Sequence, residues 1–142
     1  MDKELVAEWF KFADNDIDTA LLLKEMRPQH REIICYHCQQ AAEKYLKGFL
    51  VSKEQRPPKI HDLTNLCNIC SEHVSDFSNL LPQCSYLNQF GVQPRYPKEL
   101  EITNANVEQA VKYMLEVRDF AAIVELREEI ALNIDDGSNN RE

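Results

Sequence analysis

The chain has 142 residues, of which 16 are Lys or Arg and 24 are Asp or Glu, so its formal net charge is −8. This length fits one domain with a single core and is too short for two ordinary domains. With 44% hydrophobic residues, 28% charged residues, 3 glycines and 6 prolines, collagen-like and Pro/Gly-rich disordered chains are excluded. No apolar run approaches the roughly 18–20 residues that span a bilayer, and the first four residues include no apolar signal core. We therefore expect a cytoplasmic protein without a membrane contact.

Apolar residues recur at helical spacing from the start of the chain. The pattern predicts a first helix over residues 4–25, which Arg27-Pro28 ends because proline disfavours helical geometry in the residue before it. A second helix is predicted from Arg31 to Ser52, before the extended Pro57-Pro58 connection. The apolar positions of these two helices are Leu5, Val6, Trp9, Ala13, Ile17, Ala20 and Leu21, and then Ile34, Cys38, Ala41, Ala42, Tyr45, Leu46, Phe49 and Leu50.

Three further helical segments follow. His61 or Asp62 opens a short third helix, and residues 76–90 form an irregular fourth one in which Pro82 either occupies the first turns or divides the segment. Thr103 or Asn104 caps the last long helix. The sequence thus predicts an all-α, four- to five-helix up-and-down bundle over residues 1–132 and a frayed polar tail over residues 133–142.

Aromatic and apolar residues cover more of the two long outer helices than one core-facing stripe requires. Trp9, Phe10 and Phe12 cluster on the first helix, and the last helix is apolar around much of its circumference between residues 117 and 124. Because large exposed apolar patches usually mark interfaces, we expect a homodimer. The alternative is that these residues close the core of the bundle.

Five cysteines occur as two Cys-x2-Cys pairs, Cys35/Cys38 and Cys67/Cys70, and a single Cys84. The pairs resemble a four-cysteine zinc site, although both fall within predicted helices, where residues three apart share one face and serve equally well as small core residues. We predict no metal and no cofactor.

The stretch from Tyr36 to Leu50, YHCQQAAEKYLKGFL, resembles the second helix of HEPN (higher eukaryote and prokaryote nucleotide-binding) domain proteins, whose pattern is His, one residue, Gln-Gln-Ala, Glu-Lys and Leu-Lys. Trp9, Ala13, Asp16-Ile17 and Ala20 resemble the first-helix signature of the family. His61-Asp62-Leu63 is similar to its Thr-His-Asp-Leu, with Ile60 in place of threonine, and Arg95-Tyr96-Pro97 is similar to its Arg-Tyr-Pro. Together the resemblance spans residues 9–125.

This resemblance implies a dimeric helical bundle that binds a nucleotide or RNA. It also implies a minimal nucleotidyltransferase as the partner protein, in a toxin–antitoxin-like pair. The candidate ligand-binding residues are His37, Gln40, Lys44 and Lys47 on the second helix, with Arg95 and Tyr96 as a cation and a stacking ring. The alternative for the helical residues is a histidine bonded within the bundle and solvated lysines.

Many HEPN relatives are metal-independent ribonucleases with an Arg-x4–6-His motif, in which a guanidinium holds the phosphate and an imidazole transfers a proton. Arg31-x5-His37 and Arg56-x4-His61 fit this spacing, but no histidine follows Arg95 near the last helix, where those relatives carry the motif. A ribonuclease toxin with Arg56 and His61 as catalytic residues is therefore the alternative function. A dimeric scaffold without a ligand is the third.

Overall fold

The computed structural model describes residues 2–91 and 101–139, and beyond Glu125 it describes the side chains of Arg127, Ile130 and Asn133. These residues form five α-helices and one short 3-10 helix, without a strand among them, as the sequence predicted. In chain order the elements are α1 (Lys3–Lys24), α2 (Arg31–Ser52), α3 (Leu63–His73), η1 (Ser75–Leu80), α4 (Leu81–Asn88) and α5 (Asn104–Asn139).

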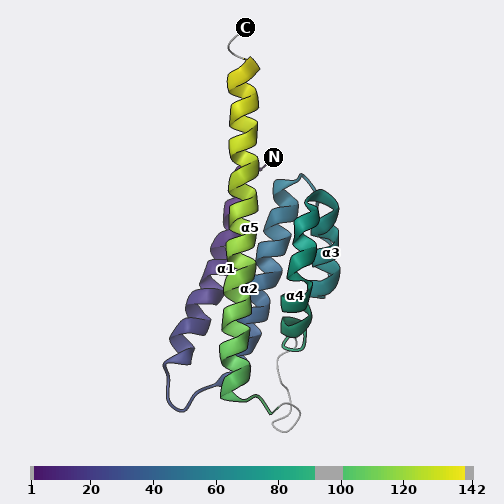
Figure 1. Cartoon of the computed structure of the whole chain (residues 1–142). Helices are drawn as coiled ribbons and strands as arrows, with labels where there is room; N and C mark the ends of the chain where they lie inside the picture. Colours follow the sequence, from purple (N-terminus) through teal and green to yellow (C-terminus); the bar gives the residue numbers. More distant parts are fainter. Residues whose placement is uncertain (1, 92–100, 140–142) are drawn as a thin grey trace.

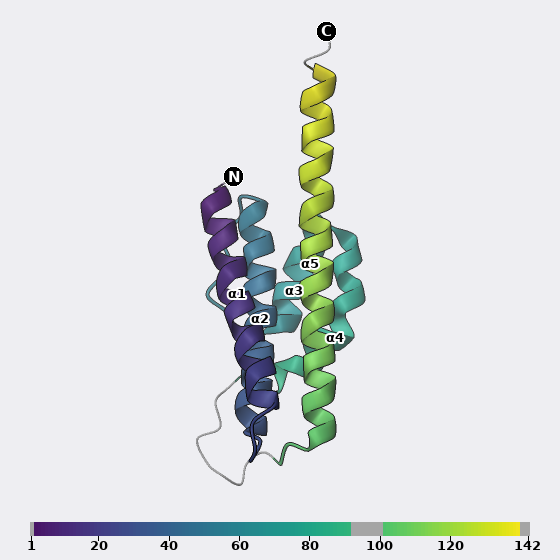
Figure 2. The same ribbon diagram turned by 90° about the vertical axis from the view of Figure 1, so that its left-hand side faces the viewer.

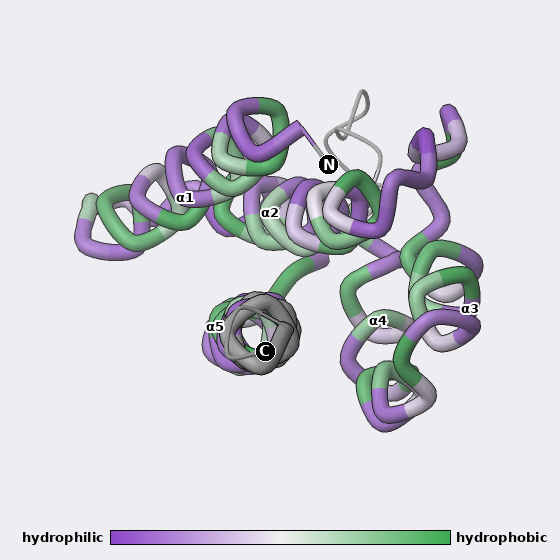
Figure 3. The backbone as a smooth tube through the Cα atoms, turned by 90° about the horizontal axis from the view of Figure 1, so that it is seen from above, coloured by the Kyte–Doolittle hydropathy of each residue, from purple (hydrophilic) through white to green (hydrophobic). Residues whose placement is uncertain are grey.

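Helix α2 is the centre of the molecule. It runs antiparallel to α1 and parallel to α5, and α3 and α4 pack on its remaining side (Figure 1). Viewed from above, α1, α5 and the α3–α4 pair surround α2 (Figure 3). Because neighbours cover it on most sides, α2 buries three polar residues, Gln39, Glu43 and Lys47, together with its predicted apolar face.

Side-chain caps set the beginnings of the helices close to where the sequence places them. Asp2 accepts a hydrogen bond from the Leu5 amide at the start of α1. Asp62 accepts from the amides of Thr64 and Asn65 at the start of α3. Thr103 precedes α5, and its hydroxyl oxygen accepts from the Asn106 amide. Each cap satisfies amide groups that lack a partner within the helix.

The core confirms most of the predicted inward positions and corrects two of them. A chain of rings, Phe49, Phe77 and Phe120, connects α2, η1 and α5 with centroid distances of 4.4 Å and 4.8 Å. Leu5 and Leu21 of α1, predicted to face inward, are 40% and 39% exposed. The apolar stripe of α1 is wider than the part of the helix that α2 covers. Leu5 and Leu21, at the edges of the stripe, therefore remain exposed to solvent.

The irregular fourth segment divides in two, as one of the two predicted alternatives stated. The 3-10 helix η1 ends at Leu80, and Pro82 lies in the first turn of α4. Proline fits there because the first amides of a helix have no intrahelical acceptor.

The last helix differs from the expected tail. The prediction ended regular structure at residue 132, whereas α5 continues to Asn139. Residues 133–139 contain no proline, and one interior glycine costs only about 1 kcal/mol relative to alanine, so nothing local forces a break. The end of α5 extends beyond the other helices (Figures 1 and 2). None of the described helices is both long enough and apolar enough to cross a membrane.

Candidate functional site

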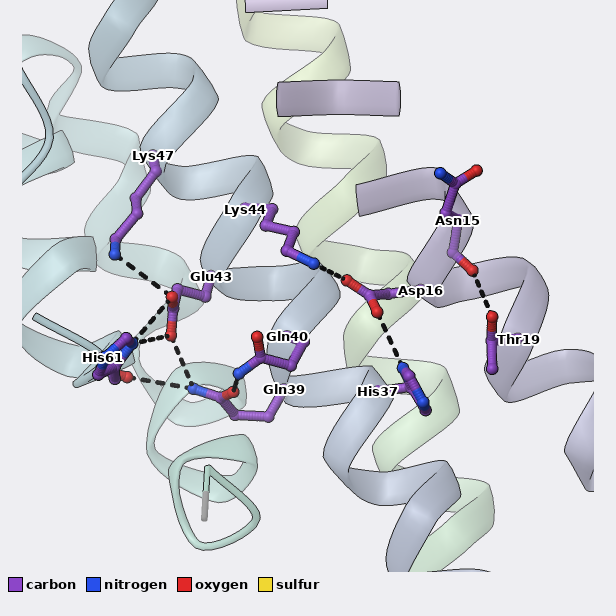
Figure 4. A network of polar contacts seen from close by, with 10 residues as sticks. All are labelled: Asn15, Asp16, Thr19, His37, Gln39, Gln40, Glu43, Lys44, Lys47 and His61. Atoms are coloured by element: carbon purple, nitrogen blue, oxygen red, sulfur yellow. Dashed lines mark hydrogen bonds and ion pairs between the residues drawn. The ribbon is translucent and has the colours of Figure 1, made fainter. Parts of the chain in front are cut away.

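Two clusters of the same composition, each with one carboxylate, one lysine and one histidine, lie along α2 (Figure 4). The first joins Asp16 of α1 to His37 and Lys44 of α2. The second joins Glu43 and Lys47 of α2 to His61 in the connection before α3. We name them the Asp16 cluster and the Glu43 cluster.

The Asp16 cluster fastens α1 to α2. Lys44 Nζ lies 2.5 Å from Asp16 Oδ2, and His37 Nδ1 donates to Asp16 Oδ1 over 2.8 Å. His37 and Lys44 are seven residues apart, two turns of helix, so they reach the same carboxylate from one face. Both side chains keep about a quarter of their surface exposed, 25% for His37 and 27% for Lys44. The cluster is therefore open to solvent at its edge.

The Glu43 cluster is buried on one side and open on the other. Lys47 Nζ lies 3.3 Å from Glu43 Oε2, and these side chains are only 7% and 6% exposed. His61 Nδ1 lies 3.1 Å from each Glu43 oxygen, whereas its side chain is 75% exposed. Since Nδ1 faces Glu43, Nε2 on the opposite edge of the ring is the nitrogen available to a ligand.

Two glutamines extend the Glu43 cluster. The fully buried Gln39 donates through Nε2 to the His61 carbonyl over 3.1 Å, and Gln40 donates to Gln39 Oε1 over 2.8 Å. These bonds fix the backbone at His61 against α2. Gln40 is half-buried, and its side-chain oxygen Oε1 is not used in either of these two bonds.

Neighbouring bonds hold the His61 connection from its other side. Asn88 of α4 accepts from the Leu63 amide and donates to Asp62 Oδ1, which joins the start of α3 to the end of α4. The Asn88 amide and the capped backbone amides lower the pKa of Asp62, because they stabilise its carboxylate form. The exposed imidazole is therefore carried by an anchored backbone.

The predicted ligand residues of α2 divide between the two clusters instead of forming one strip. His37 and Lys44 share Asp16, Lys47 turns to Glu43, and Gln40 joins Gln39. The partners of these residues, namely Asp16, Gln39 and Glu43, were not predicted as site residues. All three lie within the stretches that carry the HEPN resemblance, and an acid on the apolar face of α1 was the signal for Asp16.

The two predicted Arg–His pairs have different settings. Arg56 is exposed in the connection that also carries His61. Arg31 hydrogen-bonds Gln29, and six residues along a helix place it about 240° around the axis from His37, on another face. Arg95 and Tyr96 lie outside the described residues.

The cysteine pairs do not converge on one point. Cys70 donates to the Leu46 carbonyl, eight residues or about 12 Å further along α2 than Cys38. All five cysteines are free and buried, and burial raises the pKa of Cys35 to about 12. Among the side chains that the structure describes, no three metal-ligating groups lie close enough to hold a metal ion. These thiols therefore fill the core.

The Glu43 cluster has the chemistry of a proton-transfer or anion-binding group. A carboxylate on Nδ1 orients the imidazole and leaves Nε2 exposed, where it can contact an anion or transfer a proton. Lys47 neutralises Glu43, so the carboxylate beside the imidazole does not leave the cluster with a net negative charge.

The chain is an all-α bundle in which α1 runs antiparallel to the central α2 and α5 runs parallel to it. Its polar clusters lie along α2. The sequence profile described as the HEPN domain matches residues 6–127. The chain belongs to the HEPN domain family, a helical family related to nucleotides and RNA.

Two solved structures support the fold. One is the crystal structure of ST0689, an archaeal HEPN homologue, with a TM-score of 0.66 and 19% identity, covering 84% of this chain and 97% of the other. The second is TT1696 from Thermus thermophilus, with a TM-score of 0.72 and 21% identity, covering 82% of this chain and 95% of the other. No curated protein matches the sequence.

Proposed function

We propose that this HEPN domain binds a nucleotide or RNA along α2 and acts, as a homodimer, with a minimal nucleotidyltransferase in a toxin–antitoxin-like pair. The observation that carries the proposal is the exposed His61 imidazole on a buried Glu43–Lys47 pair. Apolar residues of the same volume often stabilise a protein as well as a buried ion pair does, so stability alone does not explain this pair. Holding an exposed imidazole in a fixed position for a ligand does explain it.

Phosphate is the ligand group that fits this cluster. A protonated His61 offers Nε2 as a charge-assisted donor, which is about twice as strong as a neutral one. With a net charge of −8 the whole chain repels extended nucleic acid backbones, so a short RNA or a free nucleotide suits it better than long RNA.

The dimer is proposed from exposed apolar side chains on α5. Ile123 and Ile130, two turns apart, are each 48% exposed, and the end of α5 extends beyond the other helices. A second copy packed along this stripe would remove both from water. We place the dimer in the cytoplasm, where its five buried thiols remain reduced. A mass of 16.5 kDa in light scattering at every concentration would refute the dimer.

A second candidate function is a ribonuclease toxin. A carboxylate–imidazole pair with one free ring nitrogen is a general acid or base, and Arg56 belongs to the same exposed connection. In this reaction His61 would take the 2′-hydroxyl proton as the 2′-oxygen attacks the phosphorus atom, Arg56 would hold the phosphate, and the 5′-oxygen would leave and take up a proton.

The experiment is calorimetry of the full chain with ATP and with a short single-stranded RNA. Gln40→Ala/Lys44→Ala and His61→Ala should each weaken binding while circular dichroism stays unchanged, and His73→Ala on the exposed end of α3 is the matched control. Unchanged affinity in both variants would remove the α2 site. Expression without a partner, with growth and RNA integrity followed, separates the functions: RNA cleavage that His61→Ala abolishes supports the ribonuclease, whereas intact RNA supports the binding partner.

A further inference from the structure

The imidazole of His61 depends on its backbone for its position. Its side chain is 75% exposed, so packing restrains the ring little, and Nδ1 lies 3.1 Å from each Glu43 oxygen (Figure 4). Because a carboxylate only accepts hydrogen bonds, Nδ1 carries hydrogen in this contact, in the neutral ring as well as in the protonated one. The contact forms only where the backbone of residue 61 places the ring beside Glu43.

Asn88, the last residue of α4, holds the three residues that follow His61. Its Oδ1 accepts from the Leu63 amide over 2.8 Å. Its Nδ2 donates to Asp62 Oδ1 over 2.9 Å and to Thr64 Oγ1 over 3.2 Å. An amide group has two donor hydrogens, so Asn88 uses both of them on this one segment.

The end of α4 thus restrains the connection from the side opposite to α2. Gln39 of α2 holds the His61 carbonyl, and Asn88 holds the residues directly after it. Gly91, three residues beyond Asn88, lies so close to Gln39 that a methyl group added there would be 3.3 Å from Gln39 Nε2. The chain at the end of α4 therefore touches both restraints on the histidine. In the hydrogen bonds that the structure describes, Asn88 contacts neither the imidazole nor Glu43.

We propose that Asn88 is a positioning residue for His61: by holding the backbone after the histidine, it keeps Nδ1 on Glu43 and directs Nε2 toward the ligand. The proposal rests on the ligand-binding role proposed above for His61. It adds α4 to the site, which no prediction from the sequence had done. Without the Asn88 bonds the connection gains freedom, the contact of Nδ1 with Glu43 breaks for part of the time, and the ring leaves its binding orientation.

The tautomer of the neutral His61 ring reports this position directly. Nitrogen NMR of the full chain at about pH 8.5, two units above the ordinary pKa of histidine, shows which ring nitrogen carries hydrogen. His61 should have its hydrogen on Nδ1 in the wild type. In Asn88→Ala it should shift toward the form with hydrogen on Nε2, which predominates in an unrestrained histidine. His37 donates through Nδ1 to Asp16 in the other cluster, so its unchanged tautomer would show that the bundle is intact.

Binding provides a second measurement, in which the effect of Asn88 should depend on the imidazole. Asn88→Ala should weaken ATP binding in calorimetry by about tenfold, the effect of losing one hydrogen bond to the ligand. In the His61→Ala background the same substitution should have no further effect, because Asn88 acts through the ring. Gln89→Ala is the matched control and should leave the affinity unchanged. Its side chain, also at the end of α4, donates to the Tyr86 carbonyl of its own turn.

A further pair of variants keeps the test decisive if Asn88→Ala fails to fold. Asn88→Asp keeps an acceptor for the Leu63 amide, but its carboxylate meets the carboxylate of Asp62. Asn88→Asp/Asp62→Asn restores a donor and an acceptor at this contact, and asparagine also caps α3. The single variant should lose the His61 tautomer and ATP affinity, and the double variant should recover both.

The outcomes separate the positioning role from the function on which it rests. If Asn88→Ala leaves the His61 tautomer unchanged, or weakens ATP binding equally with and without the imidazole, the positioning role is wrong and ATP binding stands. Equal shifts of the His61 and His37 tautomers would mean a general loss of packing and would also overturn it. If the wild-type chain binds neither ATP nor the short RNA, the proposed function fails, while the tautomers still decide whether Asn88 positions His61.

Discussion

The Asp16 and Glu43 clusters have the same three chemical groups but differ in which group meets the solvent. In the Asp16 cluster, the lysine and the histidine are each about one quarter exposed. In the Glu43 cluster, the lysine and the glutamate are almost fully buried and the histidine is 75% exposed. Position explains the contrast, since the first cluster lies where only α1 meets α2, and the second where α2 is covered by the connection to α3. In the Glu43 cluster, burial therefore distinguishes the Glu43–Lys47 ion pair from the accessible His61 imidazole. In the Asp16 cluster, the lysine and the histidine are exposed to the same degree.

The largest expected loss of stability follows from breaking the buried Glu43–Lys47 pair. Lys47→Ala leaves the Glu43 carboxylate buried and opposed only by His61, which should lower the free energy of unfolding by about 3–5 kcal/mol. Lys44→Ala removes the corresponding lysine from the more exposed Asp16 cluster and should cost about 1 kcal/mol. Urea unfolding at pH 7, followed by circular dichroism, measures both.

A double substitution distinguishes charge from packing in this comparison. Glu43→Gln/Lys47→Met keeps the side-chain volumes and removes both charges, so it should recover most of the stability that Lys47→Ala loses. Equal losses in the double variant and in Lys47→Ala would mean that packing of the lysine stem, not charge pairing, stabilises this position.

Two glycines allow the backbone beside each cluster to be tested. A methyl group added at Gly48 would lie 2.7 Å and 2.9 Å from Phe10 ring carbons and 3.0 Å from Trp9 Cβ, so α1 would have to shift. We expect Gly48→Ala to cost about 1 kcal/mol, because overpacking exceeds the gain in helix propensity. Gly91→Ala, whose methyl would lie 3.3 Å from Gln39 Nε2 near the Glu43 cluster, should stay within about 0.5 kcal/mol. Thermal or urea unfolding checks the order, and a larger loss at Gly91 would contradict it.

The connection that carries His61 should have its own pH dependence. Because hydrogen bonds lower the pKa of Asp62 in the native state, its stabilising effect is present above about pH 4, the pKa in an unfolded chain, and is lost as pH falls through the native pKa. Asp62→Ala should cost about 1 kcal/mol at pH 7 and progressively less toward pH 2. Asp62→Asn keeps a capping side chain but no titrating group, so a pH dependence that survives in this variant would assign the effect to another group.

Much of the fold follows from local sequence. Helical spacing and the proline positions place the long helices, and the caps at Asp62 and Thr103 place the starts of α3 and α5, to within about one residue at most ends. These features act through bonds between neighbours in the chain, which a sequence displays directly. For the end of α5, polar composition predicted fraying after residue 132, while no residue there excludes the helix that continues to Asn139.

The site was predicted less completely, since it depends on contacts between distant residues. The sequence could select four polar residues of α2, namely His37, Gln40, Lys44 and Lys47. It could not indicate that Lys44 pairs with Asp16 of α1 while Lys47 pairs with Glu43 of α2 itself. A hollow beside α1, which Trp9 and Phe12 line, was not predicted either. An aromatic stripe on an outer helix has the same pattern whether it lines a pocket, an interface or a core.

The smallest expected effect on stability is the most direct test of the contrast between the clusters. His61→Ala removes a mostly exposed ring and should change the free energy of unfolding by less than about 0.5 kcal/mol, since Lys47 still pairs with Glu43. His37→Ala takes from the partly buried Asp16 a hydrogen bond and should cost about 1 kcal/mol. Urea unfolding and ATP calorimetry of both variants should therefore separate them. His61→Ala should bind ATP more weakly but keep the wild-type free energy of unfolding. His37→Ala should lose both ATP affinity and stability. If His61→Ala instead destabilises the protein as much as His37→Ala, the imidazole belongs to the structural support of the Glu43 pair, and the division of roles within that cluster is wrong.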